Sequence, residues 1–89
     1  MRFDWDDDKL ASNLAKHEID FNSAVLLFDG RDVIETPSTH PSEERWQRTG
    51  IVDDRFMTVI WTRRGDGIRI ISARRARTNE KRDYYNNYP

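Results

Sequence analysis

The sequence predicts one α+β domain, with two short helices near the N-terminus, an antiparallel sheet of three to four strands and a C-terminal helix. Three observations lead to this fold class. Apolar side chains recur at helical spacing in residues 6–28. In residues 45–77 the side chains alternate as in strands, and turn residues separate the strands. In residues 79–88 Glu80, Tyr84 and Tyr88 again recur at helical spacing. Because 89 residues suffice for one small core, we expect residues 1–89 to form a single domain.

A short strand and a helix are predicted at the start of the chain. The opening "MRFDW" alternates, which places Met1, Phe3 and Trp5 on one side, as in a half-buried strand. Asp6 or Asp7 can then accept hydrogen bonds from the free N–H groups of a helix, and acidic residues suit the positive end of the helix dipole. The first helix is therefore expected to begin directly after this strand.

Each of the two predicted N-terminal helices has one apolar face. In the first, Leu10, Leu14 and His17 recur at intervals of four and three residues, so this face is expected to pack inward. The second helix has Asp20 as its N-cap candidate. Its apolar side chains at helical spacing are Phe21, Ala24, Val25 and Phe28.

The central part of the chain has the pattern of an antiparallel meander. A short strand, "RDVIET", and a loop with two prolines, "PSTHPSEE", precede it. Three strands then follow one another, with turns at Asp53-Asp54 and at residues 65–67. Their sequences are "RWQRTGIV", "RFMTVIWTRR" and "IRIISARRAR".

Two-residue loops at Asp53-Asp54 and Asp66-Gly67 predict which side chains share a face of the sheet. Trp61 would then lie opposite both Trp46 and Ser72, and Arg69 would fall on the other face. A change of one residue in loop length would exchange the faces of a whole strand. The predicted first face comprises Trp46, Arg48, Val59, Trp61, Ser72 and Arg74.

Opposite charges are separated between the two halves of the chain. Residues 1–44 hold four Lys/Arg against eleven Asp/Glu, a net charge of −7, whereas residues 45–89 hold eleven against five, a net charge of +6. Six arginines fall within residues 63–77, and a planar guanidinium can hold two phosphate oxygens at once. This pattern favours a surface that binds a polyanion. The alternative is a solvated surface on which arginine stems cover apolar residues.

Several classes of chemistry lack their characteristic residues. There is no cysteine, which excludes thiolate catalysis, and His17 and His40 have no second ligand at a metal-binding spacing. There is no glycine-rich phosphate loop and no G-x-S-x-G motif, so neither a metal nor another cofactor is expected. The chain has no apolar leader or membrane-length apolar run, and the expectation is a cytoplasmic protein without membrane contact.

The remaining residues suit cleavage of RNA by its own 2′-OH. Such an enzyme needs a base for the 2′-OH proton, cations for the charge on the phosphate and an acid for the leaving 5′-oxygen. Structural roles are the alternative for each candidate: a core histidine, packing tyrosines and surface charges. The candidates are Glu44, His17 and Lys9 for the base, Tyr84 and His17 for the acid, and Trp46 and Trp61 for stacking a nucleobase.

Two segments resemble the motifs of a known family. The stretch "WDDDKLASNLAKHEIDF" resembles the W-D-x-x-K-x-x-x-N-x-x-K-H-G-[IV]-x-F opening of the BrnT family. The stretch "WTRRGDGIRIISARRARTNEKRDYY" resembles the ending of that family, Y-T-x-R-G-x-x-x-R-I-I-S-A-R-x-A with its following helix. Glu18 stands where the family has glycine, and Trp61 where it has tyrosine.

Membership of this family would imply the toxin of a bacterial type II toxin–antitoxin module with a RelE-like fold. The resemblance implies a metal-independent endoribonuclease that cleaves RNA and inhibits translation. Whether the RNA is free or is ribosome-associated mRNA stays open. Its implied partner is a ribbon-helix-helix antitoxin, through which operator DNA would be bound. The alternative is a non-catalytic RNA- or ribosome-binding module that uses the same arginines, and its discriminating property would be binding of RNA without turnover.

The resemblance and the residue chemistry together define the expected site. The family motifs fall on Trp5, Asp6, Lys9, Asn13, Lys16, His17, Phe21, Glu44, Arg45, Arg69, Ser72, Arg74, Glu80 and Tyr84. The expected catalytic residues are Arg69, Ser72, Arg74, His17, Glu44 and Tyr84. The expected RNA-binding residues are Lys9, Trp46, Trp61, Arg63, Arg64, Arg75 and Arg77.

Overall fold

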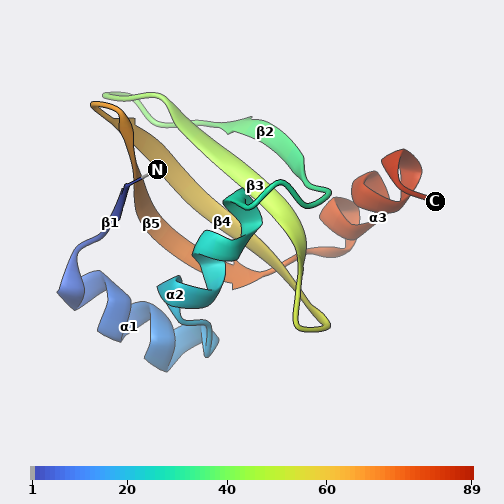
Figure 1. Cartoon of the computed structure of the whole chain (residues 1–89), viewed down its shortest axis with the longest axis horizontal. Helices are drawn as coiled ribbons and strands as arrows, with labels where there is room; N and C mark the ends of the chain where they lie inside the picture. Colours follow the sequence, from blue (N-terminus) through green and yellow to red (C-terminus); the bar gives the residue numbers. More distant parts are fainter. Residues whose placement is uncertain (1) are drawn as a thin grey trace.

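The structure is a computed structural model that describes residues 2–89, so the predicted position of Met1 lies outside the described residues. A short strand and short helices come first, the antiparallel meander β2–β5 follows, and a helix ends the chain (Figure 1). The elements are β1 (Phe3–Asp4), α1 (Asp7–His17), α2 (Phe21–Ala24), the 3₁₀ helix η1 (Val25–Phe28), β2 (Ile34–Ser38), β3 (Arg45–Val52), β4 (Arg55–Arg64), β5 (Gly67–Arg75) and α3 (Thr78–Asn87).

The sheet confirms the α+β class but has five strands rather than the three to four expected. Its order is β1-β5-β4-β3-β2, with β1 parallel to β5 and the other pairs antiparallel. β1 joins through a pairing with a strand more than 60 residues away, which local sequence patterns do not reveal. β2 extends through Pro37 into the predicted loop, since an edge strand tolerates proline.

The predicted N-terminal helices begin where expected, but the second differs in its geometry. The carboxylate of Asp6 accepts from the N–H groups of Asp8 and Lys9, and Asp20 caps α2 in the same way. The second predicted helix is divided into one α-helical turn and one 3₁₀ turn. Within residues 2–89 no helix has the length and apolar character that a membrane span requires.

The register between β3 and β4 agrees with the prediction. Trp46 pairs with Trp61, and the chain reverses through Asp53 and Asp54, whose φ angles are +50° and +64°. Two successive residues with positive φ form the type I′ turn that suits the twist of a hairpin. This two-residue turn places Trp46 and Trp61 on the same face of the sheet.

The predicted register between β4 and β5 is wrong. The hairpin turn is Gly65-Asp66, because Arg64 pairs with Gly67, and the predicted loop one residue further along does not form. A register shift follows between Ile60 and Trp61. The consequence is that Ser72 and Arg74 do not share a face with Trp46 and Trp61.

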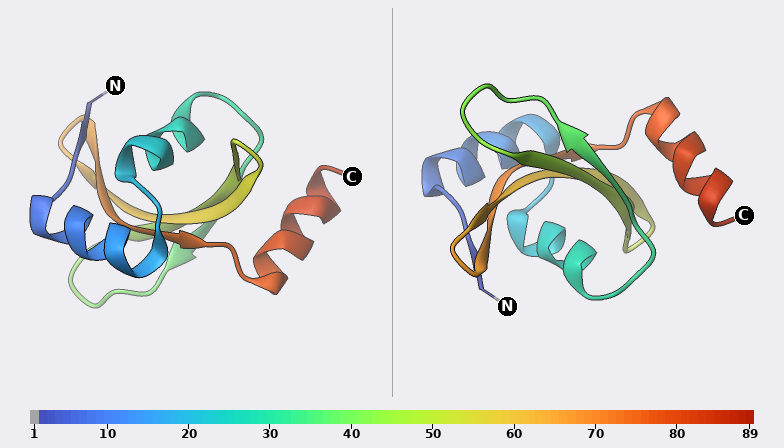
Figure 2. Two further views of the ribbon diagram at one scale, coloured as in Figure 1. Left: turned by 90° about the horizontal axis from the view of Figure 1, so that it is seen from below. Right: turned by 90° about the horizontal axis from the view of Figure 1, so that it is seen from above.

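The hydrophobic core lies on one face of the sheet, called here the inner face. Figure 2 shows α2 and η1 inside the curve of the sheet, and α1 and α3 at its two ends. Phe21 and Leu27 contribute the largest side chains from the helices, and Val59, Trp61 and Ile70 contribute from the strands. The opposite, outer face carries Thr58, Ile60 and their cross-strand partners.

Helix α1 closes the open edge of β5 beyond the short strand β1. The Asn13 amide donates to the carbonyl oxygens of Ala73, at 2.8 Å, and Ile19, at 3.2 Å, and its Oδ1 accepts from the Ala73 N–H. Asn13 is the buried residue of this helix, whereas Leu14, predicted to pack inward, is 44% exposed. A buried strand edge needs hydrogen-bond partners, and this requirement decides which side of α1 faces the sheet.

Candidate functional site

A β-bulge at Ile71 aligns three polar residues of β5 on the outer face. Trp61 pairs with Ile70, but the next residue back along β4, Ile60, pairs with Ser72, so Ile71 is an extra residue. An inserted residue reverses the alternation of all later side chains, and bulges are frequent beside active sites. The side chains of Arg69, Ser72 and Arg74 therefore share the outer face, opposite Thr62, Ile60 and Thr58 respectively.

Two adjoining hollows lie between α1 and β5 and are together called the α1–β5 groove. The first has a volume of about 410 Å³ and the second of about 380 Å³, and both are lined by Lys16 and His17. The first is also lined by Asp8, Lys9, Ser12, Asn13, Ile71 and Ser72, and the second by Ala15, Glu18, Arg74 and Arg75.

The α1–β5 groove brings together residues from the two ends of the sequence. Of the predicted site residues, it contains Lys9, His17, Ser72, Arg74 and Arg75. Basic side chains outnumber acidic ones along its walls, so the groove suits a negatively charged ligand.

Arg74 is held by a carboxylate of the C-terminal helix. Its two terminal nitrogens donate to the two oxygens of Glu80, each at 2.8 Å, and both side chains are largely buried. Glu80 also accepts from the Thr58 hydroxyl and from the Arg77 N–H. Desolvation raises the pKa of Glu80, but the hydrogen bonds from Arg74, Arg77 and Thr58 outweigh it and lower this pKa from 4.5 to about 2. The arrangement fixes Arg74 at one end of the groove.

We predict that the free energy of unfolding depends on pH through Glu80. Because the folded-state pKa of about 2 lies below the ordinary 4.5, the stabilisation is complete above about pH 4.5 and is lost as pH falls toward 2. The expected loss is on the order of 2–3 kcal/mol. Urea unfolding between pH 6 and 3 should show a weaker pH dependence for Glu80→Gln than for the wild type, and parallel curves would contradict this assignment.

Arg69 is less constrained than Arg74. Its side chain is 29% exposed, and its contact with Asp4 is an ion pair at 3.6 Å. The pairing of β1 with β5 places Asp4 beside Arg69. A partly exposed ion pair of this length is weak, so the Arg69 guanidinium can turn to an anionic ligand at little cost.

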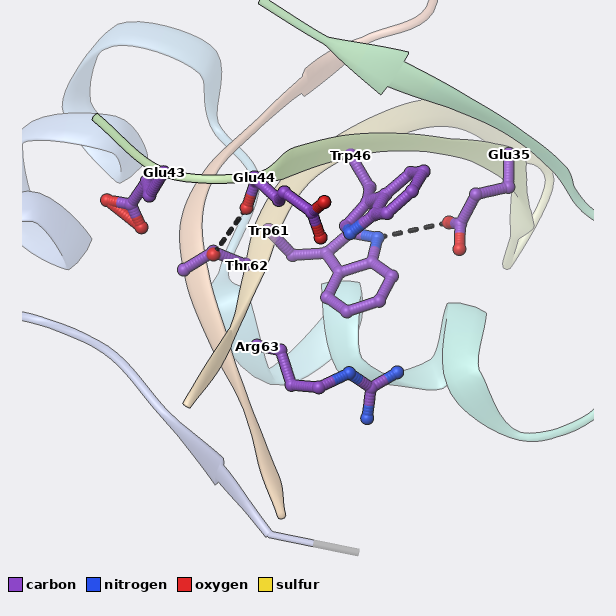
Figure 3. Close-up of a pocket in the computed structure, with 7 residues that line it drawn as sticks. All are labelled: Glu35, Glu43, Glu44, Trp46, Trp61, Thr62 and Arg63. Atoms are coloured by element: carbon purple, nitrogen blue, oxygen red, sulfur yellow. Dashed lines mark hydrogen bonds between the residues drawn. The ribbon is translucent and has the colours of Figure 1, made fainter. Parts of the chain in front are cut away.

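Four of the predicted site residues lie elsewhere, in a hollow of about 410 Å³ near the start of β3 (Figure 3). In this hollow, Glu44 extends toward the two indoles of Trp46 and Trp61. The Trp61 indole N–H donates to Glu35 at 3.0 Å, and the side chain is only 3% exposed. The fourth residue is Arg63.

The burial of Trp61 corrects its predicted use as a stacking surface for a nucleobase. Its ring packs edge-on against Phe28 and tilted against Trp46 within the core. Trp46 and Trp61 lie on the inner face, while Ser72 and Arg74 lie on the outer face. The four residues therefore do not form one site, contrary to the predicted face.

The other predicted residues lie outside the α1–β5 groove. Tyr84 packs on Phe56, and burial and the negative charge of Asp32 raise the pKa of its hydroxyl. Arg77 is the exposed N-cap residue of α3. Arg64 lines a separate hollow of about 290 Å³ near the start of β1.

Lys16 lines the groove, although it was a family-motif position only and not one of the expected catalytic or RNA-binding residues. Lys9, Asn13 and Lys16 recur at intervals of four and three residues, and therefore share one side of α1. This polar periodicity was available in the sequence beside the apolar one formed by Leu10 and Leu14. Among residues 2–89, no three His, Cys, Asp or Glu side chains are grouped so that they could hold a metal ion.

The fold and the groove together define a class: a small α+β protein with a cationic groove suited to a polyanion such as nucleic acid. The family model described as "Ribonuclease toxin, BrnT, of type II toxin-antitoxin system" matches residues 5–80. The chain belongs to this family, which confirms the resemblance of its two motif segments, and a type II system implies a protein antitoxin as partner. No curated protein matches the chain.

Proposed function

We propose that this ribonuclease toxin is an endoribonuclease that cleaves RNA in the α1–β5 groove, without a metal ion. The observation that carries the proposal is the bulge at Ile71, which puts Arg69, Ser72 and Arg74 on one face of β5. Ser72 and Arg74 line the groove beside the basic side of α1, and Arg69 lies on the same face of the strand, next to Asp4 of β1. A metal-independent cleavage needs a proton acceptor, a proton donor and cations near one phosphate. The groove and its β5 wall contain all three kinds of group.

In the proposed reaction the 2′-oxygen attacks the neighbouring phosphorus and the bond from phosphorus to the 5′-oxygen breaks. The 2′-OH proton passes to a base, and a proton is given to the departing 5′-oxygen. The products are a 2′,3′-cyclic phosphate and a 5′-OH end. Arg69 would stabilise the charge that develops on the phosphate, with Arg74 as a second cation and Ser72 as a hydrogen-bonding group.

His17 is the preferred group for proton transfer. It lines both hollows of the groove, together with Lys16, and an imidazole can both accept and donate a proton near neutral pH. Lys9 lies in the same groove and is the alternative base. Glu44 and Tyr84 have weaker support, because Glu44 lines the hollow beside the tryptophans and the raised pKa of Tyr84 makes it a poorer acid.

The proposed biological role is inhibition of translation by cleavage of mRNA, with or without the ribosome. The proposed antitoxin is a ribbon-helix-helix protein that covers the basic groove and links the toxin to operator DNA. The RelE-like resemblance and the charge of the groove support this proposal. The complementary arrangement would be an antitoxin segment with acidic side chains in the α1–β5 groove.

The test is incubation of the purified chain, freed from any antitoxin, with a 5′-labelled RNA in excess EDTA. Cleavage that leaves 2′,3′-cyclic phosphate ends and is strongly reduced in His17→Ala is the expected result. Cleavage that disappears in EDTA and returns with a divalent ion would contradict metal independence. RNA that stays intact but bound, both alone and in ribosome-containing extract, would instead favour the non-catalytic binding module.

A further inference from the structure

The α1–β5 groove continues beyond Arg75 into a third hollow. This hollow has a volume of about 250 Å³ and is lined by Asp54, Arg55, Phe56, Arg75 and Lys81. Arg75 lines both this hollow and the second hollow of the groove. The end of α1, the end of β5 and the β3–β4 turn follow one another along the lower side of the molecule in Figure 1.

The third hollow is predominantly cationic. Arg55, Arg75 and Lys81 line it with a single carboxylate, Asp54. The Arg75 side chain is largely exposed, and its distance of 3.8 Å to Glu18 makes only a loose ion pair. Arg75 is therefore available to a phosphate group that follows the groove, while Arg55 donates one of its N–H groups to the Glu18 carbonyl oxygen, at 2.8 Å, and keeps its other donors.

Aromatic rings lie beside these cations. The Phe56 ring contacts Tyr84 and Tyr85 edge-on, with centroids 5.1 Å and 5.6 Å away, and the Lys81 ammonium lies 5.9 Å from its centroid. Tyr85 is 55% exposed, and it adjoins the hollow through its contact with the lining residue Phe56. An exposed aromatic ring beside cationic side chains offers a surface on which a nucleobase can stack.

We propose that this hollow is a nucleotide subsite of the RNA-binding groove. Tyr85 stacks on a base of single-stranded RNA, while Arg55, Arg75 and Lys81 hold the adjacent phosphate. Positive charge combined with exposed aromatic rings is the usual means of binding single strands, because every base has a face that can stack. The inference rests on the proposed function, and it assigns the stacking role that the buried Trp61 cannot fill.

The subsite is close enough to the proposed cleavage position to contact the same RNA strand. Ser72 and Arg75 are three residues apart in β5, which corresponds to about 10 Å. The subsite therefore holds a nucleotide next to the scissile phosphate rather than a separate RNA molecule. Loss of stacking should weaken binding of the substrate without removing any group that transfers a proton.

The experiment is fluorescence anisotropy of the wild-type protein and variants with a single-stranded 2′-O-methyl RNA, which lacks the nucleophile and stays intact. Tyr85→Ala is expected to raise the Kd about tenfold, whereas Tyr85→Phe should keep nearly the wild-type Kd. The logarithm of the binding constant falls as the logarithm of the salt concentration rises, and Lys81→Ala should make this fall less steep by about one unit of slope. Arg82→Ala is the matched control, because Arg82 is the exposed neighbour of Lys81 and does not line the hollow.

Two results would overturn the subsite, and a third would overturn the proposed function as well. Folded Tyr85→Ala that binds and cleaves RNA like the wild type would refute the subsite alone. The same would follow if Tyr85→Ala weakened only binding of the antitoxin, which would make Tyr85 a contact for that protein. A wild-type chain that neither binds nor cleaves RNA would remove both proposals.

Discussion

Arg69→Ala is expected to reduce the rate of RNA cleavage by about 10²–10³-fold while leaving the fold intact. Removal of a single group that stabilises developing charge in a transition state has an effect of this size. The fold should persist, because the Arg69 side chain is partly exposed and its ion pair with Asp4 is long, at 3.6 Å. Single-turnover cleavage of a defined RNA, with thermal unfolding of each variant, would measure both effects.

Two further variants make this result specific. Arg82→Ala removes the same charge from the exposed side of α3 and should leave the rate of cleavage near that of the wild type. Arg69→Lys keeps the charge but loses the planar fork, so an intermediate rate is expected if two phosphate oxygens are held at once. A folded Arg69→Ala variant with the wild-type rate would exclude Arg69 from the reaction.

Arg74→Ala is expected to lower the free energy of unfolding by about 3 kcal/mol, the largest effect on stability that we predict. The substitution removes both bonds from Arg74 to Glu80 and leaves a carboxylate in a largely buried place. The remaining hydrogen bonds from Thr58 and the Arg77 N–H compensate only in part. Urea unfolding at pH 7 would measure the loss.

The double variant Arg74→Ala with Glu80→Gln tests the reason for that loss. Glutamine keeps the shape of the side chain and removes its charge, so the double variant should be more stable than Arg74→Ala alone. Equal stability of the two variants would mean that the buried charge is not responsible. The comparison also matters for function, because reduced cleavage by Arg74→Ala alone could result from displacement of α3.

The uneven charge distribution along the sequence is partly balanced within the molecule. Ion pairs join acidic residues of residues 1–44 to arginines of residues 45–89. Those at Arg69 and Arg75 are long, whereas the ion pair of Arg48 with Glu35, at 2.8 Å, packs beside Phe28 in the core region. Arg69 and Arg75 of the proposed RNA site therefore form longer ion pairs than Arg48, whose ion pair is structural. Arg74 is the exception, because its hydrogen bonds to Glu80 are short.

Local sequence determined where the helices begin, the succession of strands in the meander and one hairpin register of this protein. The caps Asp6 and Asp20 fix where α1 and α2 begin, since their carboxylates satisfy N–H groups within three residues. Asp53 and Asp54 set the β3–β4 register, because a two-residue turn leaves one pairing for the strands that it joins. The motif segments at both ends also indicated the BrnT family, which the family model confirms over residues 5–80.

Only the tertiary structure decided which of the indicated residues lie together. The bulge at Ile71 reverses the alternation of β5, so that Arg69, Ser72 and Arg74 share one face, and no turn residue marks it in the sequence. Asn13 satisfies the edge of β5 from 60 residues away. Such features depend on hydrogen bonds and packing between segments far apart in the chain, whereas propensities and spacing describe only neighbours along it.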